Sequence, residues 1–239
     1  MTFTILGRNP QTGELGIAIA TYSLAVGATC PQILPGIGVA TSQASTNPAI
    51  GEEIMELLED ATQPAKAFIQ AFVNDEHQEF RQIAFLAPTG DPIVHSGDSI
   101  KPFSGHVIAE NCVAVGNFLA NENVLQAMVD GFSEPDKNTD SAPTLADRLL
   151  SALDSGKQAG GQSSADASHL PERSACLLIG APGEPFPIDI RIDVSTNAIP
   201  ELRTAYETYL PMHDYYLNRA ENPTDLPSQD EWAKQLETN

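Results

Sequence analysis

The sequence is poor in basic residues. Its 239 residues include 12 Lys and Arg against 32 Asp and Glu, which gives a formal net charge of −20. A protein that binds a phosphate backbone needs a basic patch, and these few bases form none along the chain. We therefore expect no nucleic acid and no membrane among the partners. With 41% hydrophobic residues, the chain can still bury a substantial core.

Several other features are absent as well. No stretch approaches the roughly 18 uninterrupted apolar residues that span a membrane. The N-terminus shows no basic region followed by an apolar run, so we expect no signal peptide. The three cysteines, Cys30, Cys112 and Cys176, have no C-x-x-C spacing. This usage favours buried thiols in a reducing compartment, so the sequence predicts a cytoplasmic protein without structural zinc.

Charge is nearly absent from the first 50 residues, which contain one acid, Glu14, and one base, Arg8. Two apolar strands are predicted at 2–7 and 15–21, joined by a turn, and a third at 37–44. Strands without charge on either face are typical of sheets that are covered on both sides. The start of the chain should therefore lie inside a layered structure.

The acidic residues appear where helices are predicted. Asn47 and Pro48 form a helix start, and the helix that follows is amphipathic with acids on its outer face. A second helix is predicted from about Thr62, with four apolar residues turned inward. These are Phe68, Ile69, Phe72 and Val73.

The rest of the chain alternates strands and helices. Two hairpins are predicted between 81 and 116, then two helices, a flexible loop at 160–168, two strands between 175 and 194, and a last helix that Pro211 should kink or break. We expect one domain over 1–218 and an acidic polar arm over 219–239. This order fits an α+β protein with two antiparallel sheets packed face to face and helices outside.

The chain opens with Met1 and Thr2, and a small second residue normally permits removal of the initiator methionine. Thr2 would then combine a hydroxyl nucleophile with an α-amine whose reference pKa of roughly 7.7–8.0 suits a general base. The alternative is that Met-Thr is an ordinary start without chemical meaning. The position of Thr2 at the start of an uncharged hairpin favours the catalytic interpretation.

Six motifs in this order carry a family resemblance. They are Thr2 with the strand after it, Gly27, the stretch from Ser42 to Gly51, the triplet 95–97, Gly116 to Leu119, and the stretch 174–178. With them the chain resembles the N-terminal-nucleophile (Ntn) hydrolases, and more closely a bacterial Ntn-hydrolase-like family of unknown function (DUF1028), some members of which are labelled fimbrial assembly. The resemblance implies a four-layer αββα sandwich and suggests amide-bond hydrolysis.

Polar residues in these motifs are the candidates for a site. Asn117, after Gly116 at a strand end, is the best candidate for an oxyanion donor. Asn47 is a second candidate or simply a helix cap. A polar cluster on an apolar strand either ties the sheets together or lines a pocket. That cluster is Thr41, Ser42 and Gln43. The expected substrate-binding residues are these three together with Thr21, Ser23, Asn47 and Gly116.

The chain departs from proteasome-like relatives, which place an acid in the second strand and a lysine in the third. Residues 9–65 contain no Lys or Arg, and the second strand ends on Thr21 and Ser23. His95 and His106 lack close-spaced second ligands, so we expect no metal and no cofactor. The sequence favours a metal-independent amidohydrolase that acts on a small amide-containing molecule. The alternative is a non-catalytic binding or assembly protein on the same scaffold.

The last predicted helix has more aromatic residues than one buried stripe needs. This surplus favours a homo-oligomer, most simply a dimer. The aromatic residues are Tyr206, Tyr209, Tyr215 and Tyr216.

Overall fold

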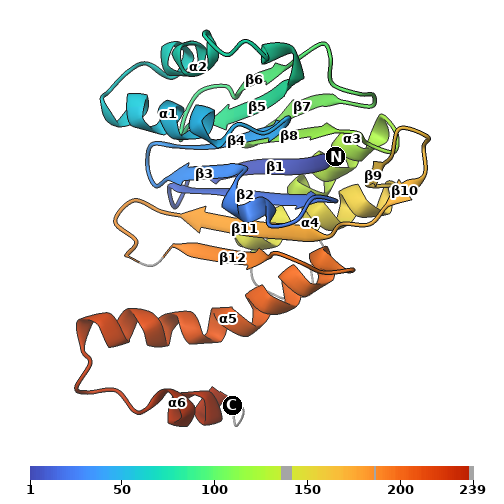
Figure 1. Cartoon of the computed structure of the whole chain (residues 1–239). Coiled ribbons are helices and arrows are strands. Elements are labelled where there is room, and N and C mark those ends of the chain that lie inside the picture. Colours follow the sequence, from blue (N-terminus) through green and yellow to red (C-terminus); the bar gives the residue numbers. More distant parts are fainter. Residues whose placement is uncertain (136–141, 186, 237–239) are drawn as a thin grey trace.

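A computed structural model describes residues 1–135, 142–185 and 187–236. The chain folds into four layers, with two antiparallel sheets packed face to face and helices on both outer faces (Figure 1). The αββα sandwich expected from the sequence is confirmed.

The larger sheet has six strands in the order β12-β11-β2-β1-β8-β7. Its two central strands are the uncharged hairpin at the start of the chain, β1 (Thr2–Asn9) and β2 (Glu14–Thr21). The other four are β7 (Gly105–Ala109), β8 (Cys112–Asn117), β11 (Ser174–Gly180) and β12 (Ile188–Ile192). Placing β1 and β2 at the centre explains their lack of charge, because both of their faces are buried.

The smaller sheet has the order β3-β4-β5-β6, with β3 (Pro31–Leu34), β4 (Gly38–Ala44), β5 (Arg81–Leu86) and β6 (Ile93–Ser96). The hairpins β5–β6 and β7–β8 are confirmed. The strand β3 was missed in the sequence, because it is short and includes a proline, which favours edge positions. There are two 3-10 turns among the described residues, η1 (Val26–Ala28), which packs mainly on β11 and β2 of the larger sheet, and η2 (Gln78–Phe80), which leads into β5.

Three apolar layers hold the sandwich together. Side chains alternate along each strand, so Phe3 and Ile5 of β1 point to helices α3 (Asn123–Ser133) and α4 (Leu145–Gln158), while Leu6 points to the other sheet. The smaller sheet is covered by α1 (Pro48–Glu59) and α2 (Pro64–Phe72). Full burial of each such side chain contributes about 1.5–3 kcal/mol.

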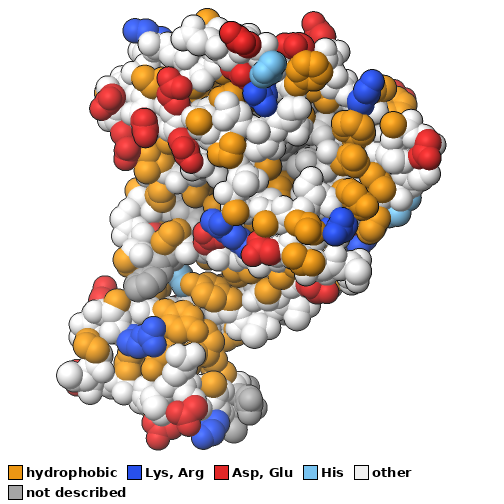
Figure 2. Space-filling model, in the orientation of Figure 1, with side chains coloured by type: hydrophobic (Ala, Val, Ile, Leu, Met, Phe, Trp, Pro, Cys, Tyr) orange, Lys and Arg blue, Asp and Glu red, His pale blue; other side chains and the backbone are white. Residues whose placement is uncertain are grey.

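The structure corrects the predicted face of α2. Phe68 is buried, but Ile69 is 58% exposed and Val73 is 54% exposed, so the inward face is completed by Ala67 and Ala71. The outer face of α1 is acidic as expected, and Figure 2 shows acidic side chains gathered over this part of the molecule. They belong to Glu52, Glu53, Glu56 and Glu59.

Two further predictions need correction. The loop predicted as flexible contains a short strand, β9 (Gln162–Ser163), paired with β10 (His169–Leu170), and Gln162 is fully buried. The last helix, α5 (Ala198–Glu221), contains Pro211 in its interior, so of the kink or break predicted there the break does not occur. Pro211 lies on an exposed side, where water can satisfy the carbonyl that loses its partner.

The end of the chain projects from the sandwich (Figure 1). The first turns of α5 pack on the larger sheet, and the rest of α5 pairs with a final helix, α6 (Gln229–Leu236), within the segment expected to be a polar arm. Two of the four tyrosines expected to mark an oligomer surface are already buried within the chain. Tyr206 packs on the core, and Tyr215 packs against Trp232 at a ring-centroid distance of 5.5 Å.

Candidate functional site

Four polar side chains form a row across the larger sheet where its central strands begin or end. Thr2 is the strand partner of both Thr21 and Asn117, and Thr21 is in turn the partner of Ser174. Paired residues of antiparallel strands project from the same face. All four side chains therefore point between the sheets, and none is more than 5% exposed. Two residues of this row, Thr2 and Asn117, were the expected catalytic residues, and the fold brings them together from positions 115 apart in the sequence.

The hydroxyl groups of the row have a defined direction. Thr2 Oγ1 lies 3.1 Å from Thr21 Oγ1, and the Thr21 hydroxyl donates to the carbonyl oxygen of Met1. A threonine hydroxyl has a single hydrogen, so Thr2 must be the donor to Thr21. With Met1 present, the Thr2 proton is thus held in a chain that ends on the Met1 carbonyl.

A second polar group faces this row from the smaller sheet. Gln43 Oε1 accepts hydrogen bonds from Thr4 Oγ1 at 2.7 Å and from Thr41 Oγ1 at 3.3 Å. Its amide nitrogen donates to Gln82 Oε1 at 2.8 Å. These residues are fully buried within an otherwise apolar layer, so their hydrogen bonds join the two sheets.

Gln82 is the centre of this network. Its amide nitrogen donates to the carbonyl oxygens of Gly116 at 2.9 Å and Gly105 at 3.3 Å, which fixes the orientation of the amide because a carbonyl can only accept. Gln82 Oε1 accepts from Asn117 Nδ2 at 3.0 Å. Asn117 therefore turns its nitrogen toward Gln82, and its oxygen Oδ1 is buried without a hydrogen-bond partner.

This orientation adds to the chemistry that the sequence suggested for Asn117. The Asn117 nitrogen carries two hydrogens, and its hydrogen bond to Gln82 uses one of them, which leaves a second N–H that can serve as an oxyanion donor. The oxygen Oδ1 of Asn117 is in addition an acceptor without a partner.

The N-terminal amine lies beside this row in a poorly hydrated place. Burial lowers the pKa of the Met1 amine from 8.0 to about 6, opposed weakly by the nearby Cys30 thiol. Burial also raises the pKa of Cys30, whose sulfur lies 3.7 Å from Thr46 Oγ1. An amine in this environment is mostly neutral at pH 7, as a general base must be.

The remaining predicted residues are distributed differently. Ser42 points to the opposite face of β4 from Thr41 and Gln43, and its hydroxyl accepts from the backbone nitrogen of Asn47 at 3.4 Å. Asn47 stands at the start of α1 but makes no side-chain cap. Ser23 is exposed, while its carbonyl accepts from Ser174 Oγ at 2.8 Å. Ser42 therefore lies on the face of β4 opposite to Thr41 and Gln43, whereas the backbone nitrogen of Ser23 donates to Thr21 Oγ1 in the row at 3.3 Å.

Four buried polar residues of this region were missed in the sequence. Gln82 is a polar residue in a covered strand, the same signal that identified Gln43, and could have been found by it. Ser174 and Thr4 are revealed only by strand register. Gln162 accepts from the backbone nitrogen of Tyr22 at 3.1 Å, but it follows two glycines in a stretch that reads as a loop.

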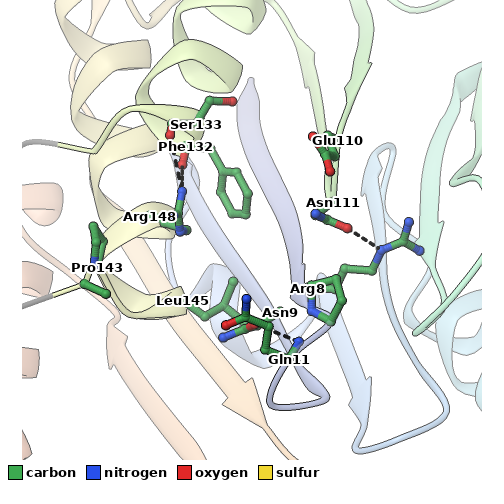
Figure 3. Close-up of a pocket in the computed structure, with 12 residues that line it drawn as sticks. Arg8, Asn9, Gln11, Glu110, Asn111, Phe132, Ser133, Pro143, Leu145 and Arg148 are labelled. Atoms are coloured by element: carbon green, nitrogen blue, oxygen red, sulfur yellow. Dashed lines mark hydrogen bonds between the residues drawn. The ribbon is translucent and has the colours of Figure 1, made fainter.

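A separate cavity of about 620 Å³ lies at the far end of β1 (Figure 3). The seven steps from Thr2 to Asn9 span about 23 Å, so this cavity is remote from the row. The guanidinium of Arg8 donates there to Asn111 Oδ1 and to two backbone carbonyls, and that of Arg148 donates to the carbonyls of Phe132 and Ser133. Both cations are thus engaged in holding loops and a helix end.

No group of three His, Cys, Asp or Glu suited to a metal occurs within residues 1–135, 142–185 and 187–236. Within the same ranges, no helix is long and apolar enough to cross a membrane.

Comparison with known proteins identifies the family. The profile of a family of unknown function, DUF1028, matches residues 2–202. The chain belongs to the DUF1028 family. The crystal structure of protein SPO2555 from Silicibacter pomeroyi, which is assigned to DUF1028, is 30% identical with a TM-score of 0.75, and the match covers 87% of this chain and 88% of that one. The family resemblance predicted from the motifs is confirmed.

More distant similarities are also found. An Anbu (Gly-1) mutant from Hyphomicrobium sp. strain MC1 is 14% identical with a TM-score of 0.43, over 88% of this chain and 95% of that one. Anbu (ancestral beta-subunit) from Yersinia bercovieri is 13% identical with a TM-score of 0.36, over 87% of this DUF1028 chain and 94% of that one. No curated protein matches.

Proposed function

We propose that this DUF1028 protein is a metal-independent amidohydrolase that uses Thr2 as an N-terminal nucleophile on a small amide-containing molecule. The observation that supports it most is the row in which Thr2 sits. Its hydroxyl lies between the sheets, 3.1 Å from the Thr21 hydroxyl and one strand from Asn117, at the end of a central strand. Thr2 is therefore both close to the N-terminus and part of a buried polar site.

Removal of Met1 is the activating step. It takes away the carbonyl that accepts from the Thr21 hydroxyl. Thr21 can then donate to Thr2 Oγ1, which leaves the Thr2 proton free for its own α-amine. It also uncovers Thr2, which is only 5% exposed beneath Met1.

The reaction then follows acyl transfer. Thr2 Oγ attacks the substrate carbonyl while the α-amine of Thr2 takes its proton, and collapse of the tetrahedral intermediate breaks the C–N bond as the amine returns that proton to the leaving nitrogen. Water next hydrolyses the ester on Thr2 with the same amine as base, releasing the acid. We assign the oxyanion to the second N–H of Asn117 together with backbone N–H groups, since the hydrogen bond to Gln82 uses only one hydrogen of that amide.

The absence of charge from the site defines the chemistry further. No Asp, Glu, Lys or Arg side chain among the described residues hydrogen-bonds to the side chain of Thr2 or Thr21. In the chain that keeps Met1, burial is the main cause of the lowered pKa of the N-terminal amine, and we expect burial to act in the same way on the Thr2 amine. A small uncharged amide fits such an environment better than a polyanion does. We assign substrate binding at this site to the polar groups of four further residues. They are Thr21, Thr41, Gln43 and Gly116, the last through its carbonyl.

Two measurements test this function together. Intact-mass analysis of the purified protein should show the loss of Met1, and an amidase panel should show turnover that Thr2→Ala abolishes and Thr2→Ser retains in part. The matched control is Thr12→Ala, on the exposed β1–β2 turn, which should keep full activity. Retention of Met1, or unchanged turnover in Thr2→Ala, would contradict the proposal.

A second candidate is a non-catalytic binding or assembly protein on the same scaffold. It is favoured by the fully buried hydrogen-bond network of Gln43 and Gln82, which already pairs polar groups between the sheets without a ligand. A Thr2→Ala protein that matches wild type in every assay, while a small molecule still raises the melting temperature of both, would favour this candidate.

We also propose a cytoplasmic location and a dimer. The first rests on Cys30, Cys112 and Cys176, which are free and buried. The second rests on the projecting α5–α6 segment, where Leu210 is 46% exposed beside the half-exposed Tyr209 and Tyr216. Light scattering after size exclusion measures the mass, and a monomer at high concentration would exclude the dimer.

A further inference from the structure

The unpaired oxygen of Asn117 needs a hydrogen-bond donor. Leaving a buried acceptor without a partner costs about 1–3 kcal/mol, and most such groups in proteins have one. Four buried side-chain atoms of the described residues lack a partner, and Asn117 Oδ1 is the one that belongs to the network between the sheets. The hydrogen bonds of Gln82 fix which atom of the amide is left free.

The strand register shows which group faces Asn117. The pairing of β1 with β8 ends at Gly7 and Cys112, and one position further Arg8 N donates to Asn111 O at 2.9 Å in the same register. Hydrogen-bonded pairs alternate along an antiparallel ladder, so every second residue of β1 back from Arg8 also directs its nitrogen to β8. Thr2 is six residues back, and its partner is Asn117.

The nitrogen of Thr2 is the atom that changes when Met1 is removed. In the longer chain it is an amide with one hydrogen, which is directed to the β8 backbone. After removal it is a tetrahedral amine with additional hydrogens, one of which can point toward the face that holds the Asn117 side chain. We propose that Asn117 Oδ1 accepts a hydrogen bond from the α-amine of Thr2 in the chain without Met1, which makes Asn117 a positioning residue for the catalytic base.

This assignment rests on the proposed function for the role of the amine as a base, but the contact itself does not require catalysis. Holding one N–H on Asn117 Oδ1 and another on the β8 backbone would orient the amine lone pair away from both. The Thr2 hydroxyl is then the nearest proton donor on the same residue. Gln82 supports the arrangement by fixing the Asn117 amide, and the carbonyls of Gly105 and Gly116 hold Gln82 in turn.

The electrostatic surroundings make the contact measurable. The titratable group that acts on the Met1 amine is Cys30, and Cys176 on β11 interacts with Cys30 in turn. No Asp, Glu, His, Lys or Arg among the described residues acts on the Met1 amine. In the chain that begins at Thr2, a carboxylate at position 117 would stand on the strand partner of the residue that carries the amine.

The experiment measures the pKa of the Thr2 amine directly. Protein that begins at Thr2 is produced by cleavage of a fusion partner, and the pH dependence of N-terminal acylation is followed by peptide mass spectrometry. In Asn117→Asp the midpoint should rise by about 1 unit or more, since an opposite charge within 4–6 Å favours the ammonium form. A midpoint within about 0.3 units of wild type would overturn the assignment.

Controls separate positioning from stability. Asn117→Leu removes the acceptor and should lower the midpoint by roughly 0.5 units, because the ammonium loses a hydrogen bond. An unchanged midpoint would count against the contact even if Asn117→Asp fails to fold.

Two further controls test whether the effect is local. Gln43→Leu breaks the same network without facing the amine, and should lower stability but not move the midpoint. Asn117→Asp in chains that keep Met1, obtained with methionine aminopeptidase inhibited, should shift the Met1 amine by less than about 0.3 units. An equal shift would mean a long-range effect and would refute the contact.

Failure of the contact and failure of the enzyme are distinguishable. If the midpoint moves as expected but no substrate or electrophile reacts at Thr2, the contact stands and the amidohydrolase proposal falls. If Thr2 reacts but the midpoint does not move, the reverse holds.

Discussion

Replacing Gln82 with methionine tests whether the polar network stabilises the contact between the sheets. Methionine has a similar length and no hydrogen-bonding amide, so Gln82→Met keeps most of the volume and removes all of the bonds. Gln82 donates to Ser96 Oγ at 3.0 Å as well as to two carbonyls, and it accepts from the amides of Gln43 and Asn117.

The expected cost follows from the groups left behind. Three of the partners are fully enclosed, namely the amide nitrogens of Gln43 and Asn117 and the carbonyl of Gly116. Each buried group without a partner costs about 1–3 kcal/mol, and partial relaxation makes the sum smaller than three full penalties. We expect a loss of about 3–5 kcal/mol in the free energy of unfolding.

Urea denaturation followed by far-UV circular dichroism measures this loss. The matched control is Gln126→Met on the outer face of α3, where the amide bonds only to the exposed Asp130, and it should change stability by less than about 0.5 kcal/mol. If Gln82→Met lies within about 1 kcal/mol of wild type, the network does not stabilise the sandwich and the reasoning is refuted.

Three further predictions concern groups around the site and the core. In chains that keep Met1, acylation of the N-terminal amine should be half-maximal at about pH 6, because burial favours the neutral form; a midpoint near 8 would show that the amine is exposed. In Gly97→Ala the new Cβ would lie 2.3 Å from backbone atoms of Glu79, so the free energy of unfolding should fall by about 2 kcal/mol or more. Calorimetry should show this loss as a Tm decrease of about 4–8 °C, and an unchanged Tm would contradict the close approach. Burial raises the pKa of Cys112 from 9.0 to about 12, so its thiolate fraction at pH 8 is about a thousandfold lower than that of an ordinary thiol. Cys112 should therefore react with a thiol reagent only after unfolding, and rapid reaction in the folded protein would disprove its burial.

The layered fold could be predicted from the sequence because its signals are local. The near absence of charge from residues 1–50 indicated covered strands, and β1 and β2 proved to be the centre of the larger sheet. The helix start at Asn47 and Pro48 was likewise visible in a few residues. The prediction that Ile69 is buried was wrong, because two alanines, Ala67 and Ala71, complete the buried face of α2.

The site was predictable only in part, because it depends on register between distant strands. The alternation of side chains could have separated Ser42 from Thr41 and Gln43, since neighbours on a strand point to opposite faces. The pairing of Thr2 with Asn117 could not be derived without the motif order of the family. The orientation of the Asn117 amide depends on Gln82 and on the carbonyl of Gly116, which no local pattern reveals.

The central claim is that Thr2 is a nucleophile activated by its own amine, and mapping the site of a covalent adduct tests it most directly. The protein as purified is incubated at pH 7.5 with a β-lactone that acylates hydroxyl nucleophiles, and the modified peptide is sequenced by mass spectrometry. We predict one adduct, on the hydroxyl of Thr2 at a free N-terminus, and none after Thr2→Ala or after acid unfolding. An unmodified Thr2 that still follows Met1, or labelling of other residues at an equal rate, would contradict the account.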